Sequence, residues 1–206
     1  MDLSGGEIFQ SLRPFFENND NLFEVEVEAC DFGPGCAGQL SSTLEGCNNS
    51  LKSVRIAYNR MGEEWLADTI AALIVHSPPE ELQFDALTMH PQLEKLELVR
   101  MNIGRNECMT LTSFLCRRTS SELNTLNLCL NSIGDQGVDI LVGALTNSRL
   151  RSLDLSSNNL TSRGCQSLAI LLKNANTNLE ELSLGHNKAH IFLQFHHLLI
   201  TNASSS

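Results

Sequence analysis

Four histidines near the end of the sequence are the first residues whose type could support chemistry: His186, His190, His196 and His197. No cysteine or carboxylate recurs at a spacing that would complete a metal site, and we expect His186 on a strand and the other three beyond it. The sequence also has no G-x-x-x-x-G-K-[ST] phosphate loop and no G-x-S-x-G nucleophile elbow. We therefore predict no metal, no cofactor, no catalytic residue and no enzymatic activity.

The charge of the chain limits the kinds of partner it can bind. Among 206 residues there are 14 Lys and Arg against 24 Asp and Glu, a formal net charge of −10. Residues 1–50 hold nine acidic residues and one basic residue, which gives −8 for that segment alone. A nucleic-acid backbone and an anionic membrane surface both require clustered positive charge. We expect neither a nucleic-acid partner nor a membrane.

Cysteine usage and hydropathy bear on the compartment. The seven cysteines are odd in number and form no C-x-x-C pair, which predicts reduced thiols. No apolar run approaches the roughly 20 residues of a membrane span, and the first residues lack the pattern of a signal peptide. These features predict a soluble, cytoplasmic protein.

The elements that would position any functional residue come from a repeated pattern. Six segments follow L-x-x-L-x-L-x-x-N-x-L, and they start at Leu22, Leu51, Leu93, Leu123, Leu150 and Leu179. The intervals between these starts are 29, 42, 30, 27 and 29 residues. Within one copy, Leu153 and Leu155 alternate with Asp154, which is the two-residue period of a strand with one buried face. Each copy therefore predicts one short strand.

Between the copies the apolar period changes to that of a helix. The spacing of Ile140, Leu141, Ala144 and Leu145 is one example, and Leu168, Leu171 and Leu172 give another. The spacing of Leu66, Ile70, Leu73 and Ile74 predicts a third helix. A strand, a helix and a return in about 29 residues form a right-handed parallel unit, and stacked units bury leucines that one unit leaves exposed.

The asparagine place of the pattern has a structural role. There the chain leaves the strand sharply, and a carboxamide can both donate to and accept from backbone groups that the turn leaves unpaired. Stacked turns would then share a ladder of hydrogen bonds, built by Cys30, Asn59, Met101, Asn131, Asn158 and Asn187. Cys30 and Met101 lack the carboxamide, so we expect water or a changed turn to compensate there.

On these motifs the chain resembles the ribonuclease-inhibitor-like class of leucine-rich-repeat proteins. The resemblance covers about residues 22–187, and "NSIGDQGVDILVGAL" (131–145) carries it most specifically. It implies an α/β fold, namely a leucine-rich-repeat solenoid or horseshoe with parallel strands on the concave face and helices on the convex face. Similar arrays occur in ribonuclease inhibitors, in Ran GTPase activators and in nucleotide-binding immune receptors, so the fold alone does not choose a function.

The predicted organisation has three parts. Residues 1–21 are expected to be the tail of an incomplete leading repeat, because Ile8, Leu12, Phe15 and Phe16 have helical spacing. Residues 22–189 contain the six repeats, with an insertion near 77–90 in which Phe84, Leu87 and Met89 could form a short amphipathic turn. Residues 190–206 are expected to form an irregular C-terminal helix and tail. Because no capping unit is visible, we expect either that a neighbouring chain covers the ends or that the chain is a piece of something longer, and we favour the second.

Alternation along the strands assigns the exposed positions of the concave face. The central column is Glu26, Arg55, Glu97, Asn127, Asp154 and Ser183. Neighbouring strands lie about 4.8 Å apart, so the first three of these residues can form a charge ladder. An interface anchor is expected at Tyr58, because exposed tyrosines often anchor interfaces. The predicted partner-binding residues are Glu24, Glu26, Glu28, Arg55, Tyr58, Glu97 and Asp154.

These observations favour a non-catalytic protein–protein interaction module that binds a protein partner on its concave face. Two alternatives remain open. One is a GTPase activator resembling the Ran GTPase-activating proteins, which accelerate chemistry in a partner and need no catalytic motif of the kinds sought above. The other is the recognition arm of a larger receptor or of a ubiquitin-ligase adaptor, which the cysteine at position 30 would suit.

Overall fold

The computed structural model describes residues 5–19, 21–28, 36–45, 51–57, 74–75, 88–89, 93–116, 122–146 and 148–188. Its helices are α1 (Gly5–Glu17), α2 (Ala37–Glu45), α4 (Arg105–Leu115), α5 (Gly134–Leu145) and α6 (Ser162–Lys173). Its longer strands are β1 (Glu24–Glu28), β2 (Ser53–Ala57) and β5 (Lys95–Val99), and the shorter ones are β6 (Thr125–Asn127), β7 (Ser152–Asp154) and β8 (Glu181–Ser183).

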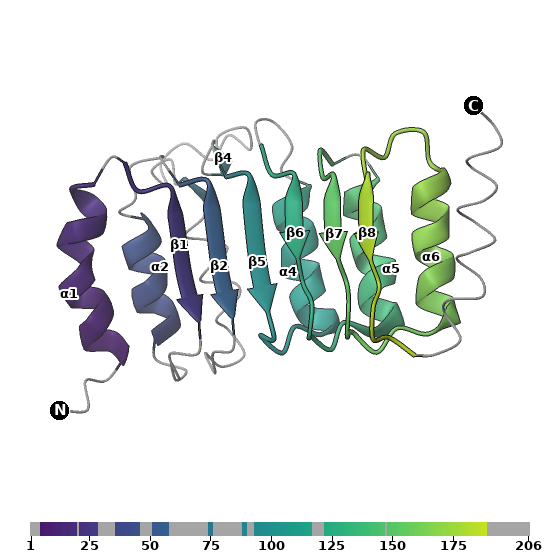
Figure 1. Cartoon of the computed structure of the whole chain (residues 1–206), viewed down its shortest axis with the longest axis horizontal. Helices are drawn as coiled ribbons and strands as arrows, with labels where there is room; N and C mark the ends of the chain where they lie inside the picture. The colour runs from purple at the N-terminus through teal and green to yellow at the C-terminus, as the bar shows by residue number, and fades with distance from the viewer. Residues whose placement is uncertain are drawn as a thin grey trace.

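Six of these strands form one sheet in the order β1-β2-β5-β6-β7-β8, and every neighbouring pair is parallel. Figure 1 shows the strands side by side, with helices α4 and α5 behind them and α1 beyond the outer edge of β1. Each strand belongs to one of the six predicted copies. The predicted α/β solenoid is therefore confirmed, and the helices leave one face of the sheet open.

The core lies between the sheet and the helices, and the leucines of the pattern build it. Leu96 and Leu98 of β5 and Leu155 after β7 are fully buried, and Leu111 of α4 packs in the same cluster. Burying one such side chain stabilises the fold by about 1.5 to 3 kcal/mol. Because each copy contributes equivalent side chains, the core is continuous along the stack.

The helix-forming segments follow the predicted apolar spacing. In α5 the buried residues include Leu141, Ala144 and Leu145, and in α6 they include Leu168 and Leu171. Thr161 caps α6 because its hydroxyl accepts a hydrogen bond from the Arg163 N–H at 3.2 Å. An N-cap of this kind typically contributes about 1 kcal/mol.

Neighbouring repeats are also joined at the helix starts. Asp135, in the first turn of α5, accepts hydrogen bonds from the backbone N–H of Thr161 at 2.8 Å and of Gly164 at 3.0 Å. A Cβ on Gly164 would lie 2.6 Å from the Asp135 carboxylate, so only glycine permits this close approach. One carboxylate thus satisfies N–H groups at the start of the next helix.

The asparagine ladder joins the turns that lead from the strands to these helix starts. The Asn131 side-chain oxygen accepts from the N–H of Met101 at 2.8 Å and of Ile103 at 3.0 Å. Its amide donates to the carbonyls of Leu98 and Leu128, both at 2.8 Å. Each asparagine therefore serves its own turn and the turn of the preceding repeat.

The next two asparagines repeat this geometry. Asn158 donates to the Leu128 carbonyl at 2.8 Å and accepts from the Ile133 N–H at 3.3 Å. Asn187 accepts from the Asn158 N–H at 2.8 Å and donates to the Leu155 carbonyl at 2.9 Å. The backbone at Met101 is thus served by Asn131 of the following repeat. Cys30, Asn59 and the turn that follows β2 lie outside the described residues.

A left-handed backbone residue precedes the ladder position in four successive turns. These residues are Arg100, Leu130, Ser157 and His186, with φ between 53° and 59°. Non-glycine residues seldom adopt this conformation, and it costs about 1 to 3 kcal/mol. The hydrogen bonds of the ladder hold the turn in place. The prediction that His186 lies on a strand is wrong, because β8 ends at Ser183 and His186 lies in this turn.

The long interval between the second and third repeats also differs from expectation. Ile74–Val75 forms strand β3, which pairs antiparallel with β4, Thr88–Met89. Ile74 therefore does not continue the predicted helix, and Met89 is not in an amphipathic turn. The β-branched residues of both segments favour strands. Most of the insertion, and the predicted helix after residue 190, lie outside the described residues.

Helix α1 forms where the apolar spacing predicts it, but its buried face differs from the predicted one. Phe9 and Phe16 are buried, whereas Leu12 is 41% exposed and Phe15 is 55% exposed. Within the described residues, α1 packs mainly against α2. No helix in the described part of the chain is both long enough and apolar enough to cross a membrane.

Candidate functional site

The open face of the sheet carries the predicted central column. Cα pairing aligns Glu26 of β1 with Arg55 of β2, and Arg55 with Glu97 of β5. The same register continues through Asn127 and Asp154 to Ser183. Strand alternation directs all of these side chains away from the face of the sheet that the helices cover.

Arg55 is the centre of an ion-pair group on this face. Its Nε lies 2.8 Å from a Glu26 carboxylate oxygen, and its two terminal nitrogens lie 3.5 Å from Glu28 and 3.1 Å from Glu97. Lys95 approaches the other oxygen of Glu97 at 3.3 Å. The predicted charge ladder therefore forms. We call Glu24, Glu26, Glu28, Arg55, Lys95 and Glu97 the acidic cluster.

The electrostatics of the acidic cluster favour the charged form of each group. Partial burial lowers the pKa of Arg55, but the hydrogen bond to Glu97 and the three carboxylates outweigh it, so the pKa is raised. Burial raises the pKa of Glu97, but hydrogen bonds from Lys95, Arg55 and Asn127 outweigh it and the pKa is lowered. Glu97 is thus an ionised, largely buried anchor of the cluster.

Carboxylates outnumber cations in the acidic cluster. Four glutamates face one arginine and one lysine, which leaves two negative charges in excess. Glu26 and Glu28 are 56% and 41% exposed, whereas Arg55 is 25% exposed. Glu24 accepts a hydrogen bond from the Ser53 hydroxyl at 3.3 Å. Glu26 and Glu28 therefore form the outer layer of the cluster, Arg55 lies beneath them, and Glu97 is the most buried of the four.

The remaining predicted site residues are less closely grouped. Asp154 lies two strands beyond Glu97, and its carboxylate accepts from the backbone N–H of Ser156 at 2.8 Å. Asn127, between them, accepts from the N–H of Cys129 at 3.0 Å. Both side chains are bound to their own turns, and Asn127 also donates to Glu97 at 3.4 Å. Tyr58 lies outside the described residues.

The cysteines of the described residues are poor nucleophiles where their pKa is shifted. Burial, together with the charge of Asp154, raises the pKa of Cys129 on the open face. Burial raises the pKa of Cys108 to about 12 and that of Cys165 to about 11. Because their pKa is raised, these thiols stay protonated at neutral pH. The reactive form of a cysteine is the thiolate, so these cysteines are poor nucleophiles. Within the described ranges, no three His, Cys, Asp or Glu residues could hold a metal ion.

A glycine pattern that begins after β1 and ends inside α2 was not anticipated. The stretch from Gly33 to Gly38 has the form G-x-G-x-x-G, which in dinucleotide-binding folds brings a turn close to a pyrophosphate. Its first residues lie outside the described part of the chain. The sheet here runs in sequential order rather than in the order of those folds, and the surrounding segment is strongly acidic. The pattern is a weak one by itself.

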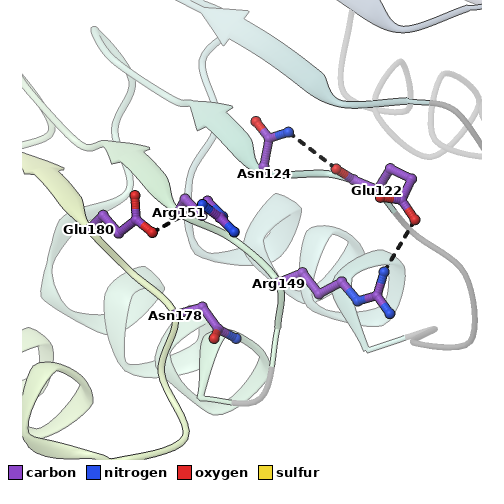
Figure 2. Close-up of a pocket in the computed structure, with 6 residues that line it drawn as sticks. All are labelled: Glu122, Asn124, Arg149, Arg151, Asn178 and Glu180. Atoms are coloured by element: carbon purple, nitrogen blue, oxygen red, sulfur yellow. Dashed lines mark hydrogen bonds and ion pairs between the residues drawn. The ribbon is translucent and has the colours of Figure 1, made fainter.

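A second surface missed by the sequence analysis is a polar hollow at the strand starts of the last three repeats. It has a volume of about 750 Å³ and is lined by Glu122, Asn124, Arg149, Arg151, Asn178 and Glu180. Figure 2 shows these side chains gathered around the opening, with Arg149 pointing toward Glu122 and Arg151 beside Glu180. The polar hollow could have been found from the sequence by comparing the residues that flank the first leucine in successive repeats.

Comparison with known proteins places the chain among repeat proteins. Residues 146–169 and 175–188 match a family model described as "Leucine Rich repeat". The mouse NACHT, LRR and PYD domains-containing protein 4C is 28% identical over 189 residues, which cover 90% of this chain and 17% of that protein. The bovine NACHT, LRR and PYD domains-containing protein 3 is 31% identical over 169 residues, 81% of this chain and 15% of that protein. The chain thus spans less than a fifth of the length of these relatives.

Two solved structures share the arrangement of strands and helices. The tropomodulin C-terminal domain from Caenorhabditis elegans superposes with a TM-score of 0.57 at 14% identity, covering 82% of this chain and 93% of that one. A structure titled "Leiomodin-1 Actin-Binding Site 2" superposes with a TM-score of 0.52 at 19% identity, covering 96% and 90%. At these identities the likeness shows the fold alone.

Proposed function

The chain is a leucine-rich-repeat protein, and from this premise we propose that it is a non-catalytic interaction module that binds a protein partner on the open, concave face of its sheet. The observation that carries the proposal is the acidic cluster, in which exposed carboxylates outnumber the cations that pair with them. Solenoids commonly bind along such a face, because every repeat contributes side chains to it.

The energetics of the acidic cluster support recognition more than stability. Exposed ion pairs contribute about 0 to 1 kcal/mol to folding. The fold therefore has little need of three glutamates on β1. A positively charged partner surface would gain attraction over a longer range, which raises the association rate and makes it depend on salt.

The residues divide into two roles within this proposal. Glu24, Glu26 and Glu28 meet the basic side chains of the partner. Arg55 and Glu97 hold the carboxylates in place from below, since Arg55 contacts three of the four glutamates. Tyr58 remains a predicted anchor at the end of β2, and Asp154 would extend the acidic surface toward β7.

The first experiment is affinity capture from an extract of the source cells, read by mass spectrometry. The baits are the wild-type chain, a Glu24→Lys/Glu28→Lys variant, and a Glu17→Lys/Asp139→Lys control with the same change in charge on helices α1 and α5. We expect a protein that wild type and control capture and that the β1 variant loses. Its affinity should fall as salt rises. Equal capture by all three baits would show that another face binds.

A second proposal is that this face is the recognition arm of a larger protein. The observation that favours it is that the curated relatives are named for NACHT, LRR and PYD domains, of which this chain resembles a short part. Sequencing the full-length transcript tests it. A coding segment for a nucleotide-binding domain in the same reading frame would support the proposal, and in-frame stop codons on both sides would dismiss it.

We also propose that the protein acts in the cytoplasm. Five cysteines in the described residues are free, as expected in a reducing compartment: Cys36, Cys108, Cys116, Cys129 and Cys165. Fractionation of source cells with an antibody to the chain would locate it, and recovery only in secreted or membrane fractions would contradict the assignment.

A further inference from the structure

The polar hollow is built from equivalent places of three successive repeats. Each of these repeats contributes the residue just before its first leucine and the residue just after it. Along the stack the first row is Glu122, Arg149 and Asn178, and the second row is Asn124, Arg151 and Glu180. The two arginines therefore form the middle pair, and each row ends in one glutamate and one asparagine at opposite corners (Figure 2).

The two arginine side chains leave the chain on the same face, and their guanidinium groups lean toward different repeats, Arg149 toward Glu122 and Arg151 toward Glu180 (Figure 2). Arg149 and Arg151 flank Leu150, which is buried, so alternation directs both arginines outward. The side chains are 68% and 66% exposed. Both guanidiniums are thus accessible from the hollow.

The ion pairs that the arginines make are weak and leave donors available. Arg149 lies 3.2 Å from Glu122, and Arg151 lies 3.2 Å from Glu180. Exposed pairs of this kind contribute little, about 0 to 1 kcal/mol. A guanidinium has five N–H donors, and each of these pairs uses one nitrogen. Among the described residues, the arginines therefore keep most of their capacity to bind an oxyanion.

We propose that the hollow binds an extended acidic segment of a protein, with two carboxylates two residues apart seated on Arg149 and Arg151. In an extended chain, side chains at this spacing lie on the same side and repeat at about 7 Å. The arginines of this chain have the same two-residue spacing, and a planar guanidinium pairs with a carboxylate through two parallel hydrogen bonds. The asparagine amides at the corners add neutral donors.

The corner glutamates determine which acidic segments fit. Glu122 and Glu180 repel further negative charge beyond the two seated carboxylates. The segment should therefore have neutral or basic residues on both sides of its Glu-x-Glu core, and a uniformly acidic chain should bind less well. This preference is opposite to that of the acidic cluster, so failure of one site leaves the other untouched.

The test is an NMR titration of the arginine Nε–H groups in the full chain labelled with nitrogen-15. The probe is N-acetyl-Glu-Ala-Glu-amide, the neutral control is N-acetyl-Gln-Ala-Gln-amide, and ionic strength is held constant. We expect saturable shifts at Arg149 and Arg151 with the acidic probe only. Arg163, which pairs with Asp139 at 3.0 Å on the helix side, is the internal control and should not shift. Absence of saturation, or equal shifts at Arg163, would overturn the proposal.

A matched pair of variants assigns the binding to the hollow. Arg149→Gln/Arg151→Gln should weaken binding of the acidic probe at least tenfold, while Arg163→Gln should leave it unchanged. The amide spectrum of each variant verifies that it is folded. A folded double variant that still binds the probe as wild type does would refute the site. If the peptide with phosphoserine in place of both glutamates bound more tightly than N-acetyl-Glu-Ala-Glu-amide, the proposal that the hollow selects carboxylates would be overturned.

Discussion

The same repeat occurs in residues 93–188 and in residues 5–57, but the interactions that join its copies differ between the two regions. In the first region, three asparagines bind successive turns together, and Asp135 joins one helix start to the next. In the second, the inward residues of edge strand β1 are Val25 and Val27, which keep 7% and 8% exposure, whereas the inward leucines of β5 are fully buried. We call these regions the ladder region and the acidic end.

The difference shows where this fold obtains stability and where it carries charge. In the ladder region, hydrogen bonds cross from repeat to repeat in the interior, where unpaired polar groups are expensive. At the acidic end, the connections between strands on the open face are ion pairs, which water weakens. Substitutions should therefore be costly in the ladder region and tolerated at the acidic end, where binding is the property that should change.

The largest expected effect comes from the core of the ladder region. Leu155→Ala removes a fully buried side chain and should lower the free energy of unfolding by about 2 to 5 kcal/mol. Val27→Ala, the equivalent change at the acidic end, should cost less, about 1 to 2 kcal/mol, because valine is smaller and sits at the sheet edge. Urea unfolding followed by circular dichroism measures both. Ile170→Ala, at a position 70% exposed, is the control. If Leu155→Ala and Val27→Ala lowered the unfolding free energy equally, the ladder region would not be more sensitive to core substitution than the acidic end.

The next effect tests the ladder itself. Asn158→Ala leaves the buried Ile133 N–H without its side-chain partner and removes one of the two amides that donate to the Leu128 carbonyl, the other being that of Asn131. We expect a loss of about 1 to 3 kcal/mol in unfolding free energy. The exposed Asn176→Ala should change stability by less than about 0.5 kcal/mol. If neither substitution changed the unfolding free energy, the hydrogen bonds of the ladder would not contribute to the stability of the stacked repeats.

A smaller, pH-dependent effect is expected at Asp135. Burial raises its pKa, but hydrogen bonds from Thr161 and Gly164 and the charge of Arg163 outweigh this and lower it. Because the pKa is lower in the folded than in the unfolded state, the ionised carboxylate adds stability above about pH 4. That stability is lost as pH falls through the folded-state pKa. Asp135→Asn should therefore cost about 1 to 2 kcal/mol at pH 7 and progressively less in acid.

Unfolding curves for both proteins at neutral and acidic pH measure this difference. The gap in unfolding free energy between wild type and Asp135→Asn should narrow below about pH 4. A gap that stays constant with pH would mean that the carboxylate acts as a neutral hydrogen-bond acceptor, and that its charge adds nothing to the joint between repeats.

Much of this architecture was predictable because the repeat is explicit. The alternation around Leu153 located a strand, and repeating the pattern predicted the column that contains Glu26, Arg55 and Glu97. The role of the asparagine of each repeat, whose side chain binds backbone groups of the turn after the strand, was also predictable. The sharing of hydrogen bonds between stacked turns was predicted as well, but not its direction, because the pattern does not indicate that Asn131 serves the turn of the preceding repeat rather than that of the following one.

The features that were missed depend on contacts between repeats or on strain. The polar hollow combines residues from three copies, and its lining positions have no fixed residue type in the pattern. The close approach of Asp135 to Gly164 requires the relative placement of two helices. The strands at Ile74 and Met89 interrupt the repeat, so periodicity could not find their pairing. The left-handed backbone at Leu130 is imposed by the turn against the preference of the residue.

The smallest expected effect separates stability from recognition within the acidic cluster. Glu26→Gln breaks an exposed ion pair while Arg55 retains Glu28 and Glu97, so the unfolding free energy should change by less than about 1 kcal/mol. Glu97→Gln removes a charge that is 13% exposed and bonded to Lys95 and Arg55, and should cost more. The same unfolding assay ranks the two changes. If Glu26→Gln left stability unaltered but weakened capture of the partner, the carboxylates of β1 would be assigned to binding. A loss of stability as large as that of Glu97→Gln would instead make the acidic cluster a structural element like the ladder.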